Sequence, residues 1–164
     1  MRFITFLTFS LALYLGCQTK NNEMPINVDV GEVTFSQESD CFETTLTLNS
    51  QSHSMTICDF KEAESSQAKM LALKLKTWLE ENLGKSKEYA ASKLVKLKNE
   101  NWLSEHEEPI NQNKFIETIE FDGINAFSEG GLEIYFKDHG LFGGHTIIVD
   151  VNEGFEFEDA KIAG

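Results

Sequence analysis

The residues best suited to chemistry lie together near the C-terminus, in the segment Lys137-Asp138-His139-Gly140-Leu141-Phe142-Gly143-Gly144-His145. An imidazole near a carboxylate can act as a general base or hold a metal ion, and glycines let the backbone approach a ligand closely. The spacing of these residues is not diagnostic of either chemistry. We therefore treat the segment as a candidate binding loop, with the candidate residues Asp138, His139, Gly143, Gly144 and His145.

Three roles are open to His145. It shares strand parity with the apolar residues that follow it, so we expect it to face inward, where a neutral imidazole donates to a backbone carbonyl. The sequence favours this structural role over ligand binding, and ligand binding over catalysis. The catalytic alternative is a small hydrolase or metal-dependent enzyme that uses His145 with Asp138 or Asp150, but Asp150 has the opposite parity. His139 is expected to be a solvated turn residue.

Other candidate sites are weaker. His106 lies in the acidic stretch Glu105-His106-Glu107-Glu108, which could gather a divalent cation but lacks a fixed scaffold. His53 has no nearby partner in the sequence. The cysteines form no Cys-x-x-Cys or Cys/His metal spacing, and neither a Gly-x-Ser-x-Gly motif nor a phosphate-binding loop is present. We predict no metal, no cofactor and no catalytic residue.

The N-terminus predicts export. Arg2 precedes an apolar run of about 13 residues that ends in Gly16-Cys17; this is too short to span a bilayer but suits a secretory signal. A small residue followed by cysteine resembles the lipobox of bacterial lipoproteins, although Tyr14 stands where leucine is usual. We predict a signal peptide over 1–16, a lipid anchor at Cys17 and a tether over 17–27, in the bacterial envelope and facing periplasm or exterior. An ordinary cleaved signal or a retained anchor are the alternatives.

The charge balance restricts the partners. The chain has 27 acidic residues against 14 lysines and arginines, and Arg2 is its one arginine. Removal of residues 1–16, which contain Arg2 and no acidic residue, changes the net charge from −13 to −14. Nucleic acid is excluded as a partner, because its phosphates need cations. The same field repels anionic lipid, so the acyl chains are the expected membrane attachment, and a basic protein is the partner that the charge favours.

The two remaining cysteines lie in a predicted β-hairpin. Residues Cys41–Leu48 and Gln51–Cys58 alternate as two strands joined by the turn Asn49-Ser50. In that register Cys41 faces Cys58, and an exported chain could close a disulfide there. A longer turn would shift the register by two and leave two free thiols.

The remaining elements indicate an α+β domain over 28–164. Asp59 and Glu62 resemble a capping box, Gly84 is expected to end the first helix, and Ser86 to cap a second that runs to about Lys98. From Phe115 onward, period-two alternation predicts an antiparallel meander, with turns at 122–123, 129–131, 138–140 and 152–154 and final strands over 145–151 and 155–162. We therefore expect a mostly antiparallel sheet covered by a helical hairpin.

A family resemblance accompanies these patterns. It rests on Tyr89-Ala-Ala-Ser-Lys-Leu, Asn101-Trp102-Leu103, Phe115, Leu132-Glu-Ile-Tyr-Phe, Leu141-Phe142-Gly143-Gly144-His145-Thr-Ile and Ala160-Lys-Ile-Ala-Gly164. These segments resemble a bacterial family catalogued only as domain of unknown function 2262. The resemblance implies no activity; some members look like immunity or accessory proteins that bind a partner. The sequence as a whole predicts a lipid-anchored, non-catalytic binding module, and a purely structural envelope component is the third possibility beside this and the enzyme alternative.

Overall fold

The computed structural model describes residues 28–164. The predicted signal peptide, the anchor at Cys17 and the tether lie outside the described residues. Within residues 28–164, no helix has both the length and the apolar character needed to cross a bilayer.

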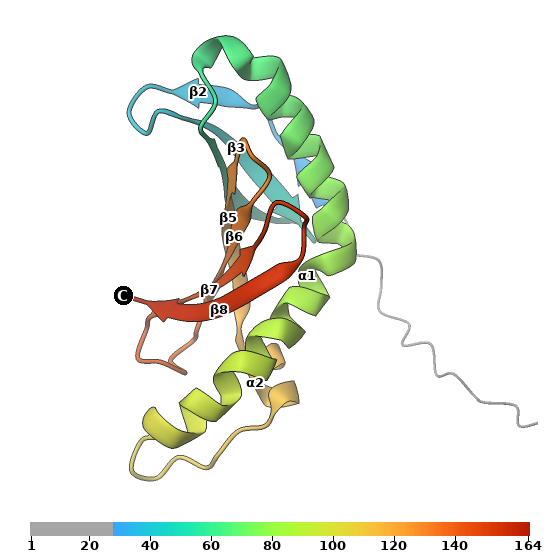
Figure 1. Cartoon of the computed structure of the whole chain (residues 1–164). Helices are drawn as coiled ribbons and strands as arrows, with labels where there is room; N and C mark the ends of the chain where they lie inside the picture. The colour runs from blue at the N-terminus through green and yellow to red at the C-terminus, as the bar shows by residue number, and fades with distance from the viewer. Residues whose placement is uncertain (1–27) are drawn as a thin grey trace, which may run out of the picture.

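The fold is a curved sheet of eight strands with one long helix along its inner face (Figure 1). The strands run in the order β1-β3-β4-β5-β6-β7-β8, and β2 also pairs with β3. Their bounds are β1 Val28–Val30, β2 Thr34–Ser36, β3 Cys41–Leu48, β4 Gln51–Cys58, β5 Glu120–Phe127, β6 Leu132–Lys137, β7 Thr146–Val151 and β8 Phe157–Ala163. All described pairs are antiparallel except β4 with β5, which is parallel. The α+β class and the mostly antiparallel sheet are as predicted.

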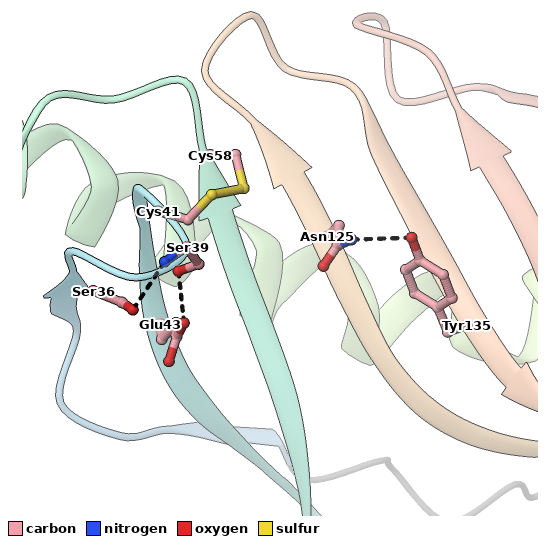
Figure 2. Close-up of a disulfide and its surroundings, with 7 residues drawn as sticks. All are labelled: Ser36, Ser39, Cys41, Glu43, Cys58, Asn125 and Tyr135. Carbon is pink, nitrogen blue, oxygen red and sulfur yellow. Dashed lines mark hydrogen bonds between the residues drawn. A yellow bond between two sulfur atoms is a disulfide. The ribbon is translucent and has the colours of Figure 1, made fainter.

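The N-terminal hairpin has the predicted register. Asn49 and Ser50 both adopt positive φ, which a two-residue turn of type I′ requires, and Thr45 lies opposite Ser54. At the other end of the hairpin, Cys41 and Cys58 are joined by a disulfide (Figure 2). The bond closes the two strands opposite their turn.

The predicted helical hairpin is wrong, because one continuous helix, α1 (Ser65–Asn101), takes its place. Gly84 lies inside this helix and not after its end; a glycine costs only about 1 kcal/mol relative to alanine there. Ser86 caps nothing: its hydroxyl donates to the carbonyl of Leu83, 2.7 Å away, within the helix. The capping box predicted at Asp59 and Glu62 is also displaced. A short 3-10 helix, η1 (Glu62–Glu64), precedes α1, and the Lys61 N–H donates to the Glu64 carboxylate at its start.

The helix is held by an apolar stripe that faces the sheet. The stripe repeats every three or four residues and keeps its phase across Gly84. Its buried apolar members are Ala68, Ala72, Leu75, Leu79, Leu83, Ala90, Ala91 and Leu94, and the polar Ser86 and Lys98 are buried beside them. Helix α1 packs against β1 at one end of the sheet and against β8 at the other. The sheet therefore curls around the helix, and the core lies between them (Figure 1).

Two further predictions for the C-terminal half need correction. The segment around Phe115 is a helix, α2 (Gln112–Thr118), which the side chain of Asn111 caps by accepting from the Lys114 N–H. Asp122 and Gly123 form no turn, because they lie inside β5 at a bulge. A Cβ on Gly123 would lie 2.6 Å from the carbonyl oxygen of Ser54 on β4. This glycine thus allows the parallel strands to approach closely.

Candidate functional site

The carboxylate of Asp138 is occupied by its own loop. It is buried and accepts the backbone N–H groups of Phe142 at 2.7 Å and of Gly140 and Gly144, each at 3.1 Å. Burial by itself would raise the pKa of the Asp138 carboxyl, but these N–H groups outweigh it and hold the pKa below its ordinary value. Asp138 is therefore an ionised organiser of the loop between β6 and β7.

His145 is held on the other side of that loop. Its Nδ1 lies 2.6 Å from the carbonyl oxygen of Phe142, to which it donates, and its ring packs edge-on against Trp102 with centroids 5.2 Å apart. The residue is half-buried and precedes β7 by one position. Among residues 28–164 no hydrogen bond joins His145 to Asp138 or Asp150, and Asp150 is paired with Lys161 at 2.7 Å.

Gly143 and Gly144 shape the backbone beside this histidine. Both adopt positive φ, of 69° and 90°, and a Cβ on Gly143 would lie 3.8 Å from the Trp102 ring. Their conformation lets the chain turn from Phe142 into β7 while the N–H of Gly144 reaches Asp138. The two glycines thus complete the loop that Asp138 organises.

His139 contacts the start of β5 and not the rest of its own loop. Its Nε2 lies 3.0 Å from Glu120 Oε2, and the Oε1 of Glu120 lies 3.9 Å from Lys137 Nζ. The predicted binding loop therefore does not form one site: Asp138, Gly143, Gly144 and His145 build the loop itself, whereas His139 belongs to a pocket next to it.

This pocket lies where the β3–β4 turn, α1, α2 and the start of β5 meet, and we call it the hairpin pocket. Its volume is about 500 Å³. Buried apolar side chains form its base, and polar side chains surround its mouth. The base contains Leu48, Leu83, Ile119 and Phe121, and the mouth contains Gln51, Glu117, Glu120 and His139.

Lys87 and His53 line the wall of the hairpin pocket. Lys87 Nζ donates to the carbonyl oxygens of Ile119 at 2.6 Å and Ile116 at 3.4 Å, so it caps the C-terminal end of α2. Burial lowers the pKa of Lys87, and the carboxylate of Glu120 offsets part of that effect. The His53 ring packs edge-on against Phe121, and its Nε2 is buried with no hydrogen-bond partner among the described residues. A buried unpaired nitrogen is a position at which a ligand atom gains a hydrogen bond.

The uncovered face of the sheet differs from the pocket because its polar groups satisfy one another. Asn125 donates to the Tyr135 hydroxyl at 3.0 Å (Figure 2), and Tyr135 donates to Glu133. Burial, together with the Glu133 carboxylate, raises the pKa of Tyr135 to about 12. Lys161 joins Glu133 to Asp150. Among residues 28–164, His53 Nε2 and Thr44 Oγ1 are the buried side-chain atoms without a hydrogen-bond partner, and His53 belongs to the hairpin pocket, which is therefore the better candidate site.

Within the acidic stretch near His106, Glu107 has a structural role. Glu107 Oε2 accepts from the buried ammonium of Lys98 at 2.7 Å and from the Ser104 N–H at 3.1 Å, and these bonds, with Lys98 first, lower the pKa of Glu107. Lys98 also donates to the carbonyl oxygen of Trp102. No group of three or more metal-ligating side chains occurs in the described part of the chain.

A family model described as an uncharacterised protein conserved in bacteria, domain of unknown function 2262, matches residues 27–162. The chain belongs to this family. The predicted resemblance is confirmed, and it extends from the C-terminal segments to the hairpin and α1. No curated protein and no solved structure matches the chain. Membership of this uncharacterised family assigns no activity, so the function has to be argued from the site.

Sequence reasoning missed most of the hairpin pocket. His53 was set aside because it has no partner nearby in the sequence, and Lys87, Glu117 and Glu120 were not singled out. His53, Lys87 and Glu117 are at least 30 positions apart along the chain, and only Glu120 follows closely after Glu117, so folding brings the first three together. One sequence signal was available, which is Gly84. The apolar stripe of α1 continues on both sides of this glycine, and the missing side chain leaves space open at the hairpin pocket.

Proposed function

We propose that the protein is a non-catalytic binding module of the bacterial envelope, anchored by lipid at Cys17, and that its hairpin pocket takes a basic side chain of a protein partner. The enzyme alternative finds no support in the geometry, because Asp138 is surrounded by backbone N–H groups and His145 donates to a backbone carbonyl. Within residues 28–164 the two side chains share no hydrogen bond, and neither lines the hairpin pocket.

The observation that carries the proposal is the arrangement of carboxylates above an apolar base. A lysine or arginine side chain has an aliphatic stem and a charged end, so it buries the stem on apolar surface and keeps the cation at the mouth. Glu117 and Glu120 supply the opposite charge there, and Gln51 supplies a further acceptor. A volume of about 500 Å³ is within the range of ordinary small-molecule sites.

The charges of the pocket favour a cation over an anion. Lys87 and His139 also lie there, but the Lys87 ammonium is committed to two carbonyl oxygens. His139 and Lys137 both engage Glu120, at 3.0 and 3.9 Å, so Glu117 is the carboxylate that remains available. The Glu117 carboxylate has no hydrogen bond or ion pair within residues 28–164. The strongly acidic chain adds long-range attraction for a basic partner and speeds its approach.

The proposal predicts that the pocket carboxylates control binding of a basic peptide. We expect Glu117→Gln with Glu120→Gln to weaken binding of an acetylated hexalysine peptide by about five- to thirty-fold, since each exposed charge contributes about 0.5 to 1 kcal/mol. Fluorescence anisotropy of the labelled peptide at low and moderate salt measures the change. Circular dichroism checks that the variant is folded.

The matched control removes two charges elsewhere. Glu153 and Glu158 are exposed and do not line the hairpin pocket, so Glu153→Gln with Glu158→Gln should reduce affinity only as much as the change in net charge requires. If the pocket variant and this control bind hexalysine equally well, the pocket is not the recognition site and the proposal is wrong.

A further inference from the structure

The charge of the molecule is strongly segregated. Helix α1 carries eight of the chain's 13 lysines and four acidic residues, a net charge of +4. The rest of the described chain carries four lysines and 22 acidic residues, a net charge of −18. The net charge of the whole chain therefore describes the sheet and loops but not the helix.

The first four turns of α1 show this most clearly. Between Ser65 and Leu79 the helix has three lysines and no acidic residue. Met70 and Leu73, 64% and 52% exposed, are the exposed large hydrophobic side chains within residues 28–164. The opposite side of the same turns is buried in the core, so the fold does not require apolar groups on the outside. We call Lys69, Met70, Leu73 and Lys74 the outer face of α1.

We propose that the outer face of α1 lies against the anionic lipid surface of the membrane to which the protein is anchored. This inference rests on the lipid anchor of the proposed function. Exposed apolar side chains flanked by lysines are the composition of helices that lie at the membrane interface. The lysines are attracted by anionic headgroups, whereas the acidic sheet is repelled and turned toward the solvent.

The length of the preceding chain supports a lipid occupant. The described chain begins at Val28 in β1, and β1 contacts α1 (Figure 1). From Cys17 to Val28 the chain can reach at most about 40 Å, and α1 itself is about 55 Å long. Acyl chains on Cys17 would thus hold α1 within one helix length of the bilayer, where a weak interfacial contact is favoured by its high effective concentration.

The ion pairs along the helix leave the outer face available. Lys76 pairs with Glu80 at 3.7 Å, and Lys74 lies over the Phe155 ring with its Nζ 4.1 Å from the centroid. Lys69 makes no ion pair within the described residues. Lys74 makes no ion pair within the described residues either, and its ammonium lies over a half-buried aromatic ring.

The experiment uses the full acylated chain in vesicles of phosphatidylethanolamine with phosphatidylglycerol. A photoreactive benzoylphenylalanine replaces Leu73, and in a matched control it replaces Thr45, which is exposed on the uncovered face of the sheet. We expect lipid adducts at position 73 and none above background at position 45. Vesicles of neutral phosphatidylcholine should reduce the adducts at position 73 by about fivefold or more.

Two outcomes would overturn the inference. Equal lipid labelling at both positions would show that α1 has no preferred orientation, and adducts of position 73 with another protein chain would show that a second copy or a protein partner covers it. A parallel fatty-acid labelling of wild type and Cys17→Ser separates the two proposals. If Cys17→Ser leaves fatty-acid labelling unchanged, the lipid anchor of the proposed function is wrong. If Cys17 is acylated but position 73 gives no lipid adducts, only the membrane contact of the outer face is wrong.

Discussion

At the scale of single residues, Asp138 shows how a candidate catalytic group can be a structural one. A carboxylate followed by histidine and glycines fits a general base, and it fits equally well a side chain that collects the N–H groups of a tight loop. The sequence is compatible with both roles. The three backbone N–H groups that donate to Asp138 favour the structural role.

We expect Asp138→Asn to destabilise the fold by about 2 to 3 kcal/mol. The amide removes the charge from three buried hydrogen bonds and turns an NH₂ donor toward N–H donors. Urea unfolding followed by circular dichroism measures the loss. Asp159→Asn is the control, because Asp159 is exposed on β8, and an equally large effect there would contradict this role of Asp138.

The same carboxylate gives the stability a pH dependence with a defined sign. Its pKa is lower in the folded state, so the ionised form contributes stability above the ordinary pKa of 3.8, and this contribution is lost as the pH falls through the folded pKa. The difference in free energy of unfolding between wild type and Asp138→Asn should therefore shrink in that acidic range. A difference that persists well below the folded pKa of Asp138 would contradict an ionic role for this carboxylate.

At the scale of secondary structure, most strands and the helical character of the stretch that forms α1 could be predicted, but the continuity of α1 could not. Period-two alternation and a two-residue turn fix the register of a hairpin locally, so β3 and β4 match the prediction. The continuity of α1 depends instead on the sheet, which buries the stripe on both sides of Gly84. Local signals such as a glycine followed by a serine give only about 1 kcal/mol each and are overridden.

Gly84→Ala distinguishes a continuous helix from a helical hairpin. In α1 the glycine does not adopt positive φ, and an added Cβ meets nothing within 4 Å. We therefore expect a stabilisation of about 0.5 to 1 kcal/mol in urea unfolding. In a hairpin, a glycine that ends a helix adopts positive φ and alanine would destabilise it.

Gly140→Ala is the matched control for that substitution. Gly140 also leaves open space for a Cβ but has a φ of 89°, so alanine there should destabilise the fold by about 1 kcal/mol. Equal effects at the two glycines would contradict the continuity of α1.

The disulfide should contribute measurably to the hairpin. Cys41 and Cys58 are 17 positions apart, and closing a loop of that size stabilises a fold by about 3 kcal/mol in the chain-entropy model. Cys41→Ala with Cys58→Ala should lower the free energy of unfolding by about that amount. Wild type unfolded in the presence of a thiol reductant should match the variant, and the variant itself should not respond to the reductant.

At the scale of the whole molecule, the sequence predicts the class of fold but not the distribution of its charge. Composition gives one net charge, and that value predicts repulsion from anionic lipid. The structure places most lysines on one helix and most acids on the sheet and loops, so two faces of one molecule are suited to different surroundings. The hairpin pocket is likewise a property of the assembled fold, because its residues come from β3, β4, α1, α2, β5 and the β6–β7 loop.

The parallel pairing of β4 with β5 affects the order in which the chain folds. The antiparallel strands on either side of it are joined mostly by short turns, but this pair aligns Ser54 with Gly123, 69 positions apart. Such a contact forms only after a long loop has closed, and its entropy cost is met before any pairing energy is gained. We expect the two antiparallel halves to form early and the joining of this one strand pair to limit the rate of refolding.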